Sequence, residues 1–232
     1  MRASDAEDAM LGDALRSPEH AERLPEDALR LPAGALELLC YLGAPDWLLH
    51  HHRVAVAAAM QLVSAIRLET GAQFDRRQVL MGAALHDCGK ILHPEERGSL
   101  GEAHEAAGEQ LLLAKGIRPE VARCCRTHRD WRSREAKLED LLVALAVRLP
   151  WGPREEILEQ RIIDAVAARS PTMSAWEVYV RIAPVFDSAA SLRPARQAPH
   201  RSSLSRADAV GLTPSRDRGC TGRISEPPQA SH

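Results

Sequence analysis

The stretch LEDLLVALAVRL, residues 138–149, constrains the fold of this chain more than any other segment. Wound as a helix, it is apolar on nearly every side from Leu141 to Val147. A helix without a polar face is stable only where other elements surround it. Aromatic residues make up only 3% of the chain, whereas Ala and Leu dominate, and this bias favours helices over strands. We therefore expect an all-α helical bundle built around this helix.

Three regions of the chain differ in composition. Residues 1–32 are charged, rich in Ala and Leu and interrupted by prolines, which predicts an N-terminal helical extension. Residues 33–190 keep a helical period and hold enough apolar residues for a core, so we expect them to form the main helical domain. In residues 191–232, Ser, Pro, Arg and Gly prevail, which predicts a disordered C-terminal tail.

Charge and cysteine content exclude several classes of protein. The formal net charge of -2 argues against nucleic acid or an anionic membrane as the main partner, and no apolar run is long enough to span a bilayer. Five cysteines without a C-x-x-C pair indicate neither a disulfide framework nor a thiolate zinc site. We expect a cytoplasmic protein that is not exported. The sequence leaves its oligomeric state open.

Helix boundaries place several histidines next to apolar faces. Asp75 with Gln78 three residues later is a capping-box variant, and the helix that it begins leads directly to His86. His104 lies in the first turns of a later helix. In the helix expected to begin at Pro119, residue 128 is a histidine on the same apolar face as two cysteines, which are most simply buried small apolar residues.

Taken together, the histidines on apolar faces and two charged neighbours form a candidate site. The set consists of His50, His86, Asp87, Lys90, His104 and His128. Any one buried histidine is more often a hydrogen-bonded core residue. Imidazole nitrogens with a carboxylate are a ligand set for a divalent Mn, Fe, Co, Ni, Zn or Mg ion. Adjacent His86 and Asp87 reach one ion only if the helix ends there, and we expect Gly89 to supply that backbone freedom. Lys90 would then donate to an anionic group, most plausibly a phosphate.

These motifs resemble the HD-domain superfamily of metal-dependent phosphohydrolases. The resemblance is carried by H-x-x-x-V-A at His50, H-D-x-G-K at residues 86–90, H-E-x-x-G at His104 and T-H at residues 127 and 128. It covers about Trp47 to Arg161. It implies an α-helical bundle that binds a divalent metal ion and acts on a small phosphorylated substrate, which could be a nucleotide.

The resemblance also implies roles for the site residues. His50, His86 and Asp87 would ligate the metal, and Asp87 would help to orient the attacking water. His50 is chosen because the ligand of this family lies four residues before a Val, with His51 and His52 as second choices. Lys90, His104 and His128 would line the phosphate pocket as catalytic residues, or the two histidines would hold a second ion.

One position departs from the pattern of the family. The last metal ligand is an Asp on a late helix, and Val147 stands at that position. Asp140 is seven residues earlier, about 10 Å away along a helix, so it does not replace the missing ligand. The loss of one negative charge predicts weaker metal binding.

Three functions fit this sequence. The first is a metal-dependent phosphohydrolase acting on a phosphomonoester or nucleotide. The second is a catalytically degenerate HD domain that binds a nucleotide or a partner without hydrolysing it, as the replacement at Val147 suggests. The third is a helical interaction protein whose histidines are core residues. This hypothesis requires that the four ordered motif matches are a coincidence.

Overall fold

The computed structural model describes residues 30–97, 101–170 and 172–191. In these ranges the secondary structure is helical and contains no strand, which confirms the predicted all-α fold. The expected N-terminal extension and C-terminal tail lie almost wholly outside the described residues, so their boundaries stay predictions. No helix in the described ranges is both long and apolar enough to cross a membrane.

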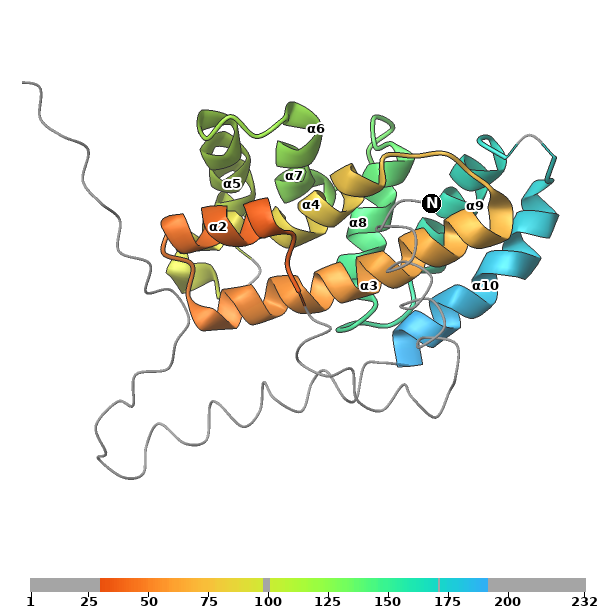
Figure 1. Cartoon of the computed structure of the whole chain (residues 1–232), viewed down its shortest axis with the longest axis horizontal. Helices are drawn as coiled ribbons and strands as arrows, with labels where there is room; N and C mark the ends of the chain where they lie inside the picture. Colours follow the sequence, from red (N-terminus) through yellow and green to blue (C-terminus); the bar gives the residue numbers. More distant parts are fainter. Residues whose placement is uncertain (1–29, 98–100, 171, 192–232) are drawn as a thin grey trace, which may run out of the picture.

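One buried helix packs against several others, as the sequence predicts. That helix, α8 (Leu138–Arg148), contacts α3 (Asp46–Thr70), α4 (Arg76–Leu85) and α9 (Glu156–Ala167), and residues 138–146 are all buried. In Figure 1, the long α3 runs across the molecule beside α8, with α9 and α10 (Ala175–Ser191) at one end. The other helices of the bundle are α2 (Ala33–Tyr41), α5 (Ala103–Ala114), α6 (Pro119–Ala122) and α7 (Cys124–Thr127).

Two local signals set the position of α4. The Asp75 side chain accepts a hydrogen bond from the Gln78 backbone N–H at 2.9 Å, which confirms the predicted helix start. In the middle of α4, a Cβ added to Gly82 would lie 2.7 Å from the Cys124 sulfur and 2.9 Å from a Val143 methyl carbon. The absence of a side chain there lets α4 approach α7 and α8 closely. As a result, the C-terminal end of α4 lies inside the bundle.

The helix expected from Pro119 is divided in the structure. It forms the short helices α6 and α7, which are joined at Arg123. Arg123 donates hydrogen bonds from Nε and Nη2 to the carboxylate of Asp140 on α8, at 3.0 and 2.5 Å. Thr127 ends α7 and is followed directly by His128. The two cysteines of α7, Cys124 and Cys125, are buried as predicted.

Candidate metal centre

Asp87 lies at the centre of a buried polar cluster where α4 ends. His86 is the C-cap of α4, and Asp87 precedes the 3-10 turn η3 (Cys88–Ile91). The Oδ2 atom of Asp87 lies 3.2 Å from Nε2 of His51 on α3, 3.6 Å from Nε2 of His86 and 2.6 Å from Nζ of Lys90. His51, His86 and Asp87 therefore form a first group with ligand atoms close enough to share an ion.

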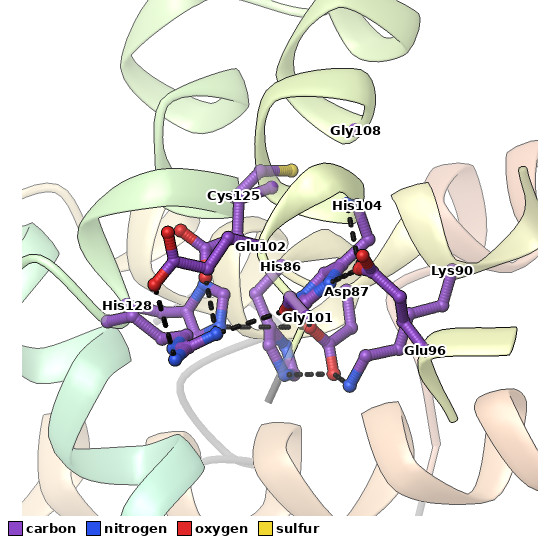
Figure 2. A network of polar contacts seen from close by, with 12 residues as sticks. His86, Asp87, Lys90, Glu96, Gly101, Glu102, His104, Gly108, Cys125 and His128 are labelled. Carbon is purple, nitrogen blue, oxygen red and sulfur yellow. Dashed lines mark hydrogen bonds and ion pairs between the residues drawn. The ribbon is translucent and has the colours of Figure 1, made fainter. Parts of the chain in front are cut away.

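The other oxygen of Asp87 faces a second group of ligands. Its Oδ1 atom lies 3.2 Å from Nε2 of His104 on α5 and 3.7 Å from Nε2 of His128. Asp87, His104 and His128 are all buried, and their ligand atoms also lie close enough to share an ion. Figure 2 shows His86, His104 and His128 converging on Asp87, with Lys90 beside it. One carboxylate thus joins two potential metal positions.

Hydrogen bonds donated by the Nδ1 atoms fix how three of these rings face Asp87. In each ring Nδ1 lies within 3.0 Å of an oxygen that can only accept a hydrogen bond, so Nδ1 donates. In the neutral ring, Nε2 then carries the lone pair that a metal requires. The acceptors are the Ala83 carbonyl for His86, the Cys124 carbonyl for His128 and the Glu96 carboxylate for His104.

Of the three adjacent histidines on α3, the structure brings His51 to the cluster. Its Nε2 atom lies 3.0 Å from Nε2 of His86. Among the described residues, neither metal-binding group includes His50, the sequence-based choice, and His50 is only partly buried. His52 is fully buried, with its ring centroid 5.1 Å from that of His86. Of the three histidines, His51, which the sequence gave only as a second choice, is the one whose ring nitrogen lies within reach of Asp87.

Two glycines bring α5 and η3 close enough for His104 to reach Asp87. A Cβ added to Gly89 would lie 1.9 Å from the His104 carbonyl oxygen and 2.7 Å from the Gly108 nitrogen. Among described glycines, a positive φ occurs at Gly43, Gly71 and Gly116. The expectation that Gly89 supplies unusual backbone freedom is thus wrong. Its function is to leave room for the backbone of α5.

Glu96, which sequence analysis missed, holds the start of α5. It ends the 3-10 turn η4 (Pro94–Glu96), and its carboxylate accepts hydrogen bonds from the backbone N–H groups of Ala103 at 3.1 Å and His104 at 3.0 Å. The same carboxylate accepts from Nδ1 of His104 at 2.6 Å. These bonds replace an N-terminal cap, because Glu102 at the N-cap position makes no side-chain capping bond. No pattern in the sequence links residue 96 to this helix.

Burial and charge set the protonation of the cluster. Burial is the main cause that holds the pKa of His86 well below its usual value and lowers that of His128 to about 4. Burial alone would raise the pKa of Asp87, but the nearby imidazoles of His86 and His104 keep it well below the usual value. The pKa of His104 is raised although burial opposes this, since the nearby carboxylates of Asp87 and Glu96 favour the protonated ring. Burial thus keeps the rings of His86 and His128 neutral beside a carboxylate anion.

This donor set fits a divalent cation. Within the described part of the chain, Oδ1 of Asp87 and Nε2 of His104 are buried without a hydrogen-bond partner, although they lie 3.2 Å apart. A cation would satisfy both atoms. Each group offers two imidazole nitrogens and one carboxylate oxygen and no thiolate, a combination that suits first-row divalent metals.

The fourth ligand of the family pattern is absent from α8. Val147 is a partly buried apolar residue packed against the core. Asp140, on the same helix, binds Arg123 and accepts a hydrogen bond from the Lys137 backbone N–H at 2.8 Å. Its carboxylate is thus occupied as a structural partner, in agreement with the distance argument from sequence.

Comparison with known families agrees with this geometry. The family described as HD domain matches residues 49–167, which is about half of the chain. The chain matches none of the curated proteins and none of the solved structures with which it was compared. The matched region contains every residue of both candidate metal-binding groups. The chain belongs to the HD-domain family.

Proposed function

We propose that this protein is a metal-dependent phosphohydrolase acting on a phosphomonoester or nucleotide, with His51, His86 and Asp87 as the metal ligands. The observation that carries the proposal is the carboxylate of Asp87, which lies among imidazole Nε2 atoms on both of its oxygens. Membership of the HD-domain family, in which metal-dependent phosphohydrolases are typical, supports the same chemistry.

The residues around the ligands suit a phosphoryl group. A bound divalent ion lowers the pKa of a coordinated water and polarises a phosphoryl oxygen. Lys90 is 2.6 Å from Asp87 and retains 17% exposure, so its ammonium group can donate to a phosphate oxygen. Asp87 accepts a hydrogen bond from the attacking water and orients it. His104 and His128 either line the phosphate pocket or hold a second ion through their Nε2 atoms.

A second candidate function follows from Val147. Without the carboxylate expected there, the ion loses one ligand and one neutralising charge. In this alternative the protein binds a nucleotide or a partner and hydrolyses nothing. The alternative keeps the same site residues, so activity and not structure distinguishes the two functions.

Turnover by wild type and Val147→Asp separates the two candidates. Metal-stripped protein would be supplied with Mn, Fe, Co, Ni, Zn or Mg and assayed on a panel of nucleotides and a generic aryl phosphate. Metal-dependent turnover by wild type supports the phosphohydrolase. Activity found only in Val147→Asp supports the binding module, and inactivity of both variants with every metal contradicts the proposed chemistry.

Metal uptake tests the ligand assignment independently of activity. His86→Ala or Asp87→Ala should abolish metal retention, because each removes a metal ligand. Helix content should change little, because both residues lie at the end of α4 and not inside a helix. His93→Ala is the matched control, because His93 is a more exposed histidine that pairs with Glu95 at 3.1 Å. Uptake that survives the first two substitutions would show that the metal binds elsewhere.

A further inference from the structure

The outer side of α10 carries large apolar residues that the rest of the bundle leaves exposed. Trp176, Tyr179 and Val180 are 70%, 44% and 53% exposed. They are three or four residues apart, so they form one continuous surface along the helix, which we call the apolar stripe. The rings of Trp176 and Tyr179 stack on each other, with their centroids 5.4 Å apart and an interplanar angle of 25°.

The opposite side of α10 is the side that holds the helix to its own chain. Val178, Ile182 and Phe186 on that side are fully buried, and α10 packs against α3 and α9. The apolar stripe is therefore not needed to fix α10 in the bundle. The chain has only two tyrosines and four tryptophans, and α10 exposes one of each side by side. Exposed tryptophan and tyrosine are typical of surfaces that bind another protein.

One flank of the apolar stripe carries a carboxylate and a guanidinium one helical turn apart. Glu177 and Arg181 are both exposed, and their spacing of four residues places them on the same flank. The Glu177 carboxylate accepts hydrogen bonds from the backbone N–H and the hydroxyl of Ser174 at 2.8 and 2.7 Å. Arg181 donates from Nη1 to the Glu69 carbonyl at 3.2 Å. Both charged groups offer more hydrogen-bonding positions than these bonds use, so each can still pair with a group on a partner.

The order of these two charges makes the surface complementary to itself. Positions 177 and 181 are equally far along the helix from Tyr179. If two copies of α10 pack antiparallel with Tyr179 at the two-fold axis, Glu177 of each copy therefore lies opposite Arg181 of the other. A parallel pair would instead place like charges opposite each other, which is unfavourable. A partner of one charge sign would satisfy only one of the two groups, whereas a second copy of the chain satisfies both.

We infer that the apolar stripe binds a second copy of this chain, which gives a two-fold symmetric dimer of antiparallel α10 helices with two Glu177–Arg181 ion pairs on its flank. In Figure 1, α10 lies at the opposite end of the bundle from α2 and α5. The inference goes beyond the proposed function and requires neither metal nor turnover. One pair of helices is a small interface, so we expect a reversible dimer with a dissociation constant in the micromolar range.

Sedimentation equilibrium of the full chain tests for the dimer. Between about 1 and 200 µM protein, the weight-average mass should rise from 25.4 kDa towards twice that value. Trp176→Ser and Val180→Asp should each raise the dissociation constant about 30-fold, as the loss of an interface hot spot does. Tyr41→Ser is the matched control and should change nothing, because Tyr41 is 66% exposed but lies on α2. Circular dichroism would confirm that each variant keeps its helix content.

Mixing two charge variants identifies the occupant as a second copy. Arg181→Glu alone places two pairs of carboxylates opposite each other, and Glu177→Lys alone places two pairs of cations opposite each other. Each variant should therefore dimerise more weakly than wild type. An equimolar mixture of the two variants restores both pairs of opposite charges, so it should dimerise about as tightly as wild type.

Three results would overturn the inference. The first is a wild-type chain that stays monomeric over the whole concentration range, whatever else then covers the apolar stripe. The second is a dimer that survives both Trp176→Ser and Val180→Asp, which would place the contact on another surface. The third is a mixture of the two charge variants that associates no better than either variant alone, because the antiparallel pairing would then be wrong.

Discussion

Replacing Gly89 by Ala should destabilise the fold and open the metal centre together. The new Cβ would lie 1.9 Å from the His104 carbonyl oxygen and 2.7 Å from the Gly108 nitrogen. Both are backbone atoms and cannot rotate away, so η3 and α5 must separate by about 1 Å to reach a normal contact. Overpacking of this kind costs about 1–3 kcal/mol. We expect a loss near 3 kcal/mol, because two backbone atoms oppose the methyl group.

Urea unfolding followed by circular dichroism measures this loss, with Gly34→Ala as the matched control. Gly34 is on α2 and a Cβ there would meet nothing within 4 Å. Alanine at that position should stabilise the protein by about 0.5–1 kcal/mol. If Gly89→Ala unfolds at the same urea concentration as wild type, the close approach of η3 and α5 is not what selects glycine in the H-D-x-G-K motif.

Three other residues give further predictions. Glu96→Ala should lower the thermal midpoint and leave His104 without its Nδ1 acceptor, which the ¹⁵N shifts of its ring would report as a mixture of tautomers. The metal-free protein should become less stable by about 3 kcal/mol as the pH falls from 6.5 to 4. In this pH range His128 binds a proton in the unfolded protein but not in the folded one, where its pKa is about 4. His128→Gln should flatten this part of a pH series of urea unfolding curves. Asp140→Ala should cost about 3 kcal/mol in the same assay without changing metal uptake, since it leaves Arg123 without its buried partner.

The fold could be predicted because its main signals are local. The apolar surface of residues 141–147 requires burial on all sides, and Asp75 with Gln78 fixes a helix start within four residues. The division between α6 and α7 was not predicted. The apolar spacing from Val121 to His128 is the same for one helix or two, and the bond from Arg123 to Asp140 that accompanies the division joins residues 17 apart.

The site could be predicted only in part, since its geometry depends on how helices are rotated. Successive residues on a helix point about 100° apart, so His50, His51 and His52 face three directions. The packing of α3 against α4, α8 and α10 decides which of the three rings faces Asp87. The spacing from Val54 selected His50, whereas the ring that lies next to Asp87 is that of His51. Glu96 was missed for a related reason, because it contacts the cluster through a turn that no periodic pattern describes.

The composition of the two candidate metal-binding groups, together with Val147, also indicates which ions the site should prefer. Asp87 supplies the one carboxylate of either group within the described residues, and each group adds two imidazoles. Mg²⁺ favours oxygen ligands and keeps its waters, whereas Co, Ni and Zn bind imidazole well. An Asp at position 147 would add an oxygen ligand. Val at this position therefore lowers the affinity for Mg²⁺ more than the affinity for the other ions. In calorimetric titrations of the stripped protein we therefore expect Zn or Co to bind at least about 100-fold more tightly than Mg, and Val147→Asp to narrow the gap. Equal affinities in wild type would mean that oxygen ligands other than Asp87 dominate the site.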